Sequence, residues 1–374
     1  MELATTLKGQ SIQNRIREVG VNPNYWYPVE WANQVQSGEI KPVMIWRRAI
    51  ALYRDTQGDL HALEDACPHK GVELHKGQVQ GPNLACPYHG WEFNGAGDCV
   101  NIPYFPKDQK LPCARARSYP VQEKYGIIWI FPGELNLANS RQPPVIPEYD
   151  HPDWFIVRIP GRFQAHFSIC NENTMDVFHG FLHKELQGWF DPVLLNLQQT
   201  ESDVCADYQV SYQGWLTKFI GIGKPGNGVT TRTVSIRYQY PHYHSSLEEV
   251  SSLYLMRSPI EPALTRSFSL MFLRLPLPKW LLKGPLQPLI EKLILDHIFL
   301  KFLHQDVEMM ESEQRNYLAN RDRQYVEVNP AIIALQRVII GQYEKFMQQS
   351  RQPSNQTNGG YKASFPLAEM VTSD

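Results

Sequence analysis

The sequence Cys67-Pro68-His69, followed after 16 residues by Cys86-Pro87-Tyr88-His89-Gly90-Trp91, decides the fold of this 374-residue chain. Each half offers one thiolate and one imidazole. Two cysteines and two histidines can hold one zinc ion, or a two-iron cluster with both cysteines on one iron and both histidines on the other. Zinc knuckles usually pair cysteine with cysteine and histidine with histidine, whereas each loop here is mixed. The spacing therefore favours the two-iron cluster.

These two loops resemble the cluster loops of Rieske non-haem iron oxygenases. In the respiratory type of Rieske protein each loop carries one further cysteine, and the two form a disulfide. Val72 and Pro87 stand where those cysteines would be expected. The resemblance therefore implies a cluster of the lower-potential oxygenase type. It also implies four ligands for that Rieske [2Fe–2S] cluster: Cys67, His69, Cys86 and His89.

A second group of candidate metal ligands lies between Asn171 and His183. His179 and His183 are four residues apart, so on a helix both imidazoles point to one side, and Asp176 shares that face. Two imidazoles and one carboxylate with open positions suit a non-haem Fe(II) that must bind O2. The residues alone leave a second interpretation open, a helix with two half-buried histidines.

This stretch resembles the mononuclear iron motif of the same family, an acidic residue and an asparagine ahead of D-x2-H-x4-H. The resemblance implies that His179 and His183 bind the iron. It implies that Asp176 lies between the two metal centres and forms a hydrogen bond to a cluster histidine, and that Asn173 binds weakly or lies beside the iron. Three residues, not four, separate the histidines here. We therefore expect the local helix geometry to depart from the family pattern.

The third iron ligand should be a carboxylate far along the chain. The stretch from His304 to Gln314 resembles the late acidic helix of the family, which ends in glutamine. That resemblance favours Asp306 as the ligand, with Glu308 and Asp296 as alternatives. Most carboxylates on a charged helix are only solvated, so a purely structural role is the competing interpretation.

The length and the pattern of the chain predict an α+β fold with two domains. In the first domain, short alternating strands predict a small antiparallel sheet. The resemblance implies that the second domain has a helix-grip (START-like) fold, with an antiparallel sheet and C-terminal helices. The predicted division of the chain is an N-terminal arm at 1–24, a Rieske [2Fe–2S] domain at 25–135, a linker at 136–150, a catalytic non-haem iron domain at 151–350 and a flexible tail at 351–374.

The elements of the second domain follow from the apolar pattern and from the prolines. We expect helices from Phe167 to His183, from Pro278 to about Gln314, and from Pro330 to Gln349, the last with a favourable proline in its first turn. Five strands are expected to form the sheet: Trp154 to Ile159, Val204 to Tyr212, Arg232 to Tyr240, Val250 to Met256, and Ser267 to Leu275.

Composition narrows the possible partners and location. The net charge of −2 gives no reason to expect nucleic acid as a partner. Six cysteines without disulfide spacing, beside an iron–sulfur motif, suggest a reducing compartment, the cytoplasm. No stretch is apolar enough to predict a transmembrane segment. The nearest, Trp280 to Leu303, is interrupted by charges and could lie against a membrane or a lipid-like substrate.

The resemblance implies an oxygenase that uses O2 and electrons from a separate ferredoxin or reductase, since no flavin or NAD motif is evident. The single-chain layout resembles the group with pheophorbide a and chlorophyllide a oxygenases and bacterial O-demethylases. The expected substrate is a bulky apolar ring compound that is hydroxylated, demethylated or ring-cleaved. A monooxygenase reaction is favoured over aromatic dihydroxylation by a dioxygenase, and the expected assembly is a homotrimer. The alternative function is an electron carrier or redox sensor, which would need no two-histidine, one-carboxylate site.

Overall fold

The computed structural model describes residues 11–186, 188–214, 228–276 and 278–350. Within these residues the chain forms two compact units, one made of 22–143 and the other of 11–21 with 144–350. Residues 1–10 of the arm predicted at 1–24, and the whole tail predicted at 351–374, lie outside the described ranges.

The first unit consists of three small antiparallel sheets, with strand orders β1-β10-β9, β2-β3-β4 and β5-β6-β7-β8. The sequence predicted one small sheet. The division into three follows from strands of only two to seven residues, too short for a single continuous ladder. The strands are β1 (Tyr27–Trp31), β2 (Ile40–Ile45), β3 (Arg48–Arg54), β4 (Leu60–Glu64), β5 (Gln78–Gln80), β6 (Asn83–Ala85), β7 (Glu92–Phe93), β8 (Cys99–Asn101), β9 (Val121–Lys124) and β10 (Ile127–Ile130).

The core of this unit includes both cysteines of the two loops. Cys67 and Cys86 are buried in one cluster with the side chains of β3, β4 and β6. Tyr53, Leu63 and Leu84 are fully buried members of the same cluster. The sulfur ends of the loops are therefore held by a packed core, while the histidines that follow them lie nearer the surface.

The second unit is built on a seven-stranded antiparallel sheet with the order β11-β17-β16-β15-β14-β13-β12. All five strands expected from the sequence are present. Two strands were not expected: β12 is an edge strand with mostly half-buried or exposed side chains, and β15 is short and polar, so neither has a clear apolar alternation. The strands are β11 (Phe155–Phe163), β12 (Trp189–Gln199), β13 (Asp203–Tyr212), β14 (Thr230–Gln239), β15 (His242–Leu247), β16 (Ser251–Glu261) and β17 (Leu264–Leu273).

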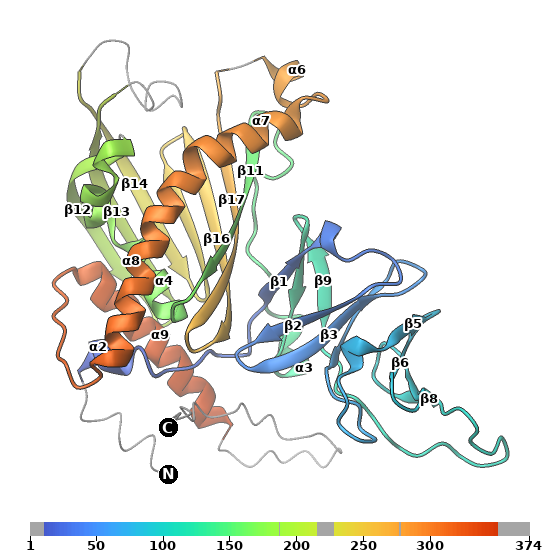
Figure 1. The fold of residues 1–374 in the computed structure, drawn as a ribbon. Helices are drawn as coiled ribbons and strands as arrows, with labels where there is room; N and C mark the ends of the chain where they lie inside the picture. The colour runs from blue at the N-terminus through green and yellow to red at the C-terminus, as the bar shows by residue number, and fades with distance from the viewer. Residues whose placement is uncertain (1–10, 187, 215–227, 277, 351–374) are drawn as a thin grey trace. The chain divides into compact units, whose positions relative to one another are not determined.

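Helices cover one face of this sheet, and the long α7–α8 helix runs across it (Figure 1). This arrangement confirms the predicted α+β class. The helix α9 (Pro330–Gln349) begins at the expected proline, and the Asn329 side chain caps it by accepting from the Ala331 N–H at 3.0 Å. The second unit also contains α6 (Lys279–Leu282), α7 (Gln287–Ile294), a π-helical turn (Leu295–Phe299) and α8 (Leu300–Ala319), whereas α3 (Leu135–Ala138) belongs to the first unit.

The single helix predicted from Phe167 to His183 is two helices of different kind. The α-helix α4 (Phe167–Met175) ends where Asp176 adopts an extended backbone, with φ −84° and ψ 101°. A 3-10 helix, η4 (Val177–Leu186), follows directly. The prediction of one continuous α-helix is therefore wrong at Asp176, whose carboxylate accepts the Phe178 N–H at 2.9 Å and starts the second helix.

Residues 11–21, part of the N-terminal arm predicted at 1–24, pack into the second unit. A short helix, α2 (Ile12–Arg15), precedes Ile16 and Val19, which are fully buried. Arg17 donates two hydrogen bonds of 2.6 Å to the Glu172 carboxylate on α4 and one of 2.7 Å to Glu313 on α8. This bidentate pairing fixes the N-terminal segment against the helix that precedes the histidine pair.

Candidate metal centres

The two loops of the first unit have the same backbone hydrogen-bond pattern. In each loop the cysteine N–H donates to the carbonyl five residues later, Val72 at 2.8 Å and Trp91 at 2.8 Å, and the glycine N–H donates back to the cysteine carbonyl. These glycines, Gly71 and Gly90, have φ of 72° and 69°, a conformation that favours glycine. Two matched turns therefore present one cysteine and one histidine each.

The four side chains of these turns are suited to a two-iron cluster. The His69 and His89 ring centroids lie 4.7 Å apart, and His69 stacks on Trp91 with centroids 4.5 Å apart and planes 6° apart. His69 Nδ1 is buried and has no hydrogen-bond partner within the described residues. Burial, together with the neighbouring Cys86, raises the pKa of the Cys67 thiol to about 11. Bound metal would remove this unfavourable burial of thiols and of an imidazole nitrogen.

The second unit brings three predicted ligands together. His179 and His183 on η4 and Asp306 on α8 place their ligand atoms within 4.8 Å of one another. The Asp306 Oδ1 atom lies 3.3 Å from His183 Nε2 and 3.7 Å from His179 Nε2. In a 3-10 helix residues four apart do not share one stripe, yet these two imidazoles converge, with ring centroids 5.3 Å apart. Two imidazole nitrogens and one carboxylate oxygen facing one point are a donor set for a non-haem iron.

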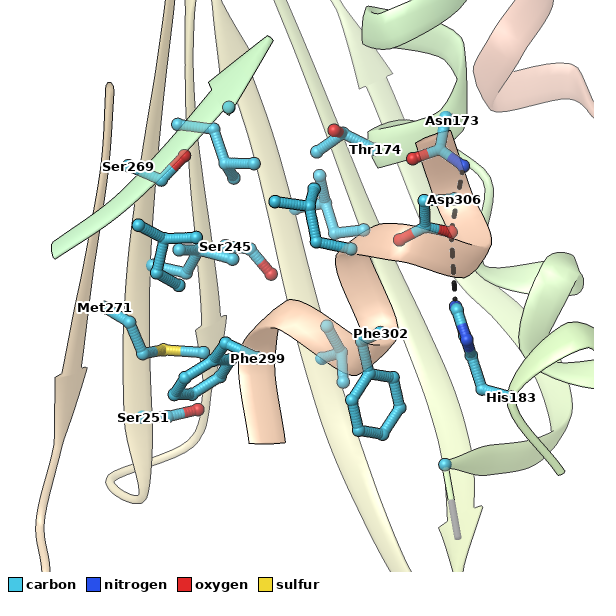
Figure 2. A pocket seen from close by; sticks show the side chains of 18 of the residues that line it. Asn173, Thr174, His183, Ser245, Ser251, Ser269, Met271, Phe299, Phe302 and Asp306 are labelled. Carbon is cyan, nitrogen blue, oxygen red and sulfur yellow. Dashed lines mark hydrogen bonds and ion pairs between the residues drawn. The ribbon is translucent and has the colours of Figure 1, made fainter. Parts of the chain in front are cut away.

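Neighbouring side chains hold these three groups in place. The Asn173 amide donates to Asp306 Oδ1 at 3.3 Å, and Gln305 Oε1 lies 2.8 Å from His183 Nδ1 (Figure 2 shows Asn173, Asp306 and His183 in line). Trp189 packs 5.2 Å from both imidazole rings. Gln305 and Trp189 were not predicted from the sequence. Gln305 directly precedes Asp306 on the same helix. Its contact with His183 could not be predicted, because the two residues are far apart in the sequence.

The two alternative carboxylates lie elsewhere. Asp296 is on the π-helical turn and pairs with the Lys292 ammonium at 2.6 Å. Glu308 is exposed on α8 and does not belong to the His179–His183–Asp306 group. Among the described residues, the geometry therefore favours Asp306 over both.

The electrostatics of the two histidines differ. Burial lowers the pKa of His179, against the opposing charges of Asp306 and Asp176. His183 is also buried, but its hydrogen bonds with Asp306 and Gln305 outweigh burial and raise its pKa. Burial therefore dominates at His179, whereas the contacts with Asp306 and Gln305 dominate at His183.

Asp176 lies at the junction of α4 and η4. Its Oδ1 atom accepts from the Phe178 N–H and from the Asn329 amide, the latter at 3.2 Å. Asp176 and His179 also line a polar cavity of about 380 Å³ with the Arg17–Glu172–Glu313 cluster. The contact between Asp176 and a cluster histidine stays a prediction.

A second, apolar cavity of about 350 Å³ adjoins the three candidate ligands. Side chains of β11 and β13 to β17 line it on the sheet side, and the helical stretch from Ile294 to Met310 lines the other side. In Figure 2, Met271 and three serines lie on the sheet at one end, and Asp306 and His183 lie at the other. Most of the side chains that line the cavity are aliphatic or aromatic, as in sites for apolar small molecules.

Comparisons with known proteins agree with these two sites. A family model described as the Rieske [2Fe-2S] domain matches residues 25–120. The chain is 32% identical over 346 residues to the 4beta-methylsterol monooxygenase of Methylococcus capsulatus, covering 90% of this chain and 92% of that protein. The chain belongs to the Rieske oxygenase family. As a member of that family it is a Rieske non-haem iron oxygenase, an enzyme that consumes O2 and oxidises a substrate with electrons from a separate reductase.

Other relatives are matched over shorter stretches. The oxygenase component of dicamba O-demethylase from Stenotrophomonas maltophilia is 33% identical over 43% of this chain and 47% of that protein. Chlorophyllide a oxygenase of Chlamydomonas reinhardtii is 30% identical over 44% of this chain and 25% of its own length. The resemblance to chlorophyllide a oxygenases and O-demethylases that the sequence indicated is therefore confirmed.

Solved structures confirm the fold. Dicamba monooxygenase bound to 3,6-dichlorosalicylic acid superposes with a TM-score of 0.73 at 20% identity, covering 89% of this chain and all of that one. A further structure of that enzyme, with non-heme iron and dicamba, has a TM-score of 0.63. The cofactors expected from the sequence, a Rieske [2Fe–2S] cluster and a mononuclear non-haem iron, agree with the family and with the His179–His183–Asp306 group. Among the described residues no helix is both long and apolar enough to cross a membrane.

Proposed function

We propose that this chain is the oxygenase component of a monooxygenase system for a bulky, apolar ring compound of about sterol size. One atom of O2 enters a C–H bond of the substrate, and the other leaves as water. Two electrons come from a reductase or ferredoxin, and two protons come from solvent. The observation that carries the proposal is the apolar cavity of about 350 Å³ that ends at the His179–His183–Asp306 group.

The residues for each metal follow from the two sites. Cys67, Cys86, His69 and His89 would hold the cluster, and His179, His183 and Asp306 would hold the iron. The cluster supplies single electrons, and the iron supplies the oxidising chemistry toward O2 and the substrate. The protein contributes position, a dry cavity and proton control.

The chain orients the iron ligands through neighbouring hydrogen bonds. Gln305 fixes the His183 ring through Nδ1, so that Nε2 faces Asp306. Asn173 donates to Asp306 Oδ1 and sets the angle of that carboxylate. Asn173 is itself placed by α4, which Arg257 anchors to the sheet by donating to Asn171 Oδ1 at 2.8 Å and to Thr174 Oγ1.

The cavity supports a large apolar substrate. Its volume lies in the range of pockets that enclose drug-sized ligands. Burying apolar surface there contributes roughly 25 cal/mol per Å², so shape and apolar area would dominate recognition. The sterol monooxygenase relative, matched along almost its whole length, favours a fused-ring hydrocarbon as the substrate skeleton.

We further propose a homotrimer in which the cluster of one subunit serves the iron of the next. Supporting this, the surface beside Asp176 is apolar and exposed. Phe181 is 75% exposed, and Val326 and Val328 from the segment before α9 are 88% and 84% exposed. Asp176 would relay the electron at this surface through a hydrogen bond to a cluster histidine of the neighbouring subunit. Exposed apolar side chains that lie together often mark a protein–protein contact.

The test is aerobic turnover of the purified holoenzyme with a supplied reductase and a panel of methylated sterols, other fused-ring compounds and single-ring aromatic acids. Under ¹⁸O2, the expected product from a fused-ring compound is heavier by one labelled oxygen atom. Products formed only from single-ring acids, or products with two labelled atoms, would refute the proposed substrate class or the monooxygenase reaction. Reduction of the cluster with no product from any compound would favour the electron carrier instead.

A further inference from the structure

A continuous apolar stripe lies on the outer face of the helices that precede the iron ligand Asp306. Leu286, Leu289 and Leu293 are spaced three and four residues apart, so they lie on one side of α7. Trp280 precedes them on α6 (Lys279–Leu282), the short helix next to α7 in Figure 1. The exposed fractions of these large side chains are 73% for Trp280, 46% for Leu286, 56% for Leu289 and 51% for Leu293.

The neighbouring face of α7 is apolar as well. Ile290, Ile294 and Leu295 pack against β11 and β17 in one hydrophobic cluster. A helix that is apolar on two faces normally has both covered. Here the core covers one, and the stripe of Trp280, Leu286, Leu289 and Leu293 is exposed in the part of the chain that the structure describes.

Charge and position indicate that a lipid surface covers this stripe. Lys283, between Trp280 and Leu286, is exposed, and so is Lys301, which follows the stripe at the start of α8. The acidic groups of this helix are already paired, Glu291 with the Arg158 guanidinium at 3.0 Å and Asp296 with Lys292. Exposed leucines with a tryptophan and flanking lysines are typical of helices that lie in the boundary between headgroups and acyl chains.

The stripe is also next to the apolar cavity. The side chains of Ile294, Ile298 and Phe299 line that cavity from the same helix whose outer face carries the leucines. An apolar ring compound of the proposed size partitions into bilayers, so an enzyme that meets it there avoids its low concentration in water. One helix therefore separates the exposed stripe from the proposed substrate site.

We propose that the Trp280–Leu293 stripe binds the surface of a lipid bilayer, so that the cavity receives its substrate from the membrane. The lipid origin of the substrate rests on the proposed function; the surface binding does not. No bilayer-spanning segment is required, because α6 and α7 would lie in the plane of the interface. Anionic lipids should strengthen the contact through Lys283 and Lys301.

The experiment is co-sedimentation of the full-length holoenzyme with phosphatidylcholine vesicles, with and without one quarter phosphatidylglycerol. We expect the wild type to pellet with the vesicles, and more so with the anionic lipid. The double variant Leu289→Ser/Leu293→Ser should lower the partition coefficient about tenfold or more, because two leucines no longer enter the acyl boundary. Trp280→Ser alone should lower it several-fold.

The matched control is Leu318→Ser, which removes a leucine of 46% exposure near the other end of α8. It should leave the partition coefficient unchanged. Far-ultraviolet circular dichroism establishes that each variant is folded, and cluster absorbance establishes that it holds its cluster. If the double variant does not fold, the partition coefficient of Trp280→Ser tests the proposal instead.

Three results would overturn the proposal. The first is a wild type that does not pellet with either kind of vesicle. The second is a Leu318→Ser variant whose partition coefficient falls as much as that of the double variant. The third is a double variant that binds vesicles as well as the wild type does. If sedimentation velocity instead shows a smaller assembly only for the double variant, while the wild type ignores vesicles, the stripe is a contact between copies of this chain. The vesicle assay does not depend on substrate, O2 or reductase, so its result is independent of the turnover test.

Discussion

The cluster loops and the iron-ligand group are built in opposite ways. Cys67, His69, Cys86 and His89 come from two neighbouring turns whose backbone hydrogen bonds match residue for residue. The iron-ligand group joins η4 to α8, and Gln305 contacts His183 across 122 positions of sequence. The first site depends on local turns, and the second depends on how the helices pack on the sheet.

The largest effect should come from a cluster cysteine. Cys86→Ser removes the buried thiol of a proposed cluster ligand from one of the two matched turns, so the cluster should be lost and turnover should fall below detection. The measurements are visible absorbance and product formation. Cys113→Ser is the matched control, since Cys113 is an exposed free cysteine outside the two turns. Normal cluster absorbance in Cys86→Ser would contradict the assignment.

The next largest effect should come from the carboxylate that joins the two helices. Asp306→Asn keeps the shape of the side chain but removes the charge, and turnover should fall by about 10²-fold or more while cluster absorbance stays normal. Glu308→Gln makes the same chemical change two residues later on the exposed face of α8. Equal losses in the two variants would mean that Asp306 has no special place at the iron.

Asp176→Asn tests the link between the two kinds of site. The asparagine oxygen can still accept the Phe178 N–H, so η4 should keep its start and both metals should stay bound. Turnover should fall about 10- to 100-fold, because the charged hydrogen-bond partner for a cluster histidine is lost. Rapid-mixing reoxidation of the reduced cluster checks this directly. Near-normal reoxidation and product formation would remove the proposed bridging role.

A smaller effect is expected from Gln305→Leu. This change keeps the volume on α8 and removes the hydrogen bond at 2.8 Å from His183 Nδ1. Iron affinity should fall about tenfold, because the ring is no longer held with Nε2 toward Asp306. A chelator titration followed by iron analysis measures it. Restoration of affinity by Gln305→Glu, which also accepts from Nδ1, would separate orientation from general damage to the helix.

The two regions also differ in how much the sequence could predict. The Cys-Pro-His loops, the five main sheet strands and α9 follow from short-range patterns, and each is present. The break at Asp176 was not predicted because a helix end set by a side-chain cap depends on tertiary contacts, here with Asn329.

The other features that the sequence did not predict also depend on how the elements pack. β12 is a half-exposed edge strand, so its side chains carry no clear alternation. Gln305 and Trp189 act through contacts that exist only once η4, β12 and α8 are packed together. The choice of Asp306 over Asp296 and Glu308 came from resemblance, because spacing alone could not order three carboxylates on one helical stretch.

Iron and sulfide counting tests the central claim most directly. If one chain holds both sites, the anaerobically loaded wild type should contain about three iron atoms and two acid-labile sulfides. Asp306→Asn should contain about two of each, since only the mononuclear iron is lost. A wild type with two irons and two sulfides, or an Asp306→Asn variant that keeps three irons, would contradict the account.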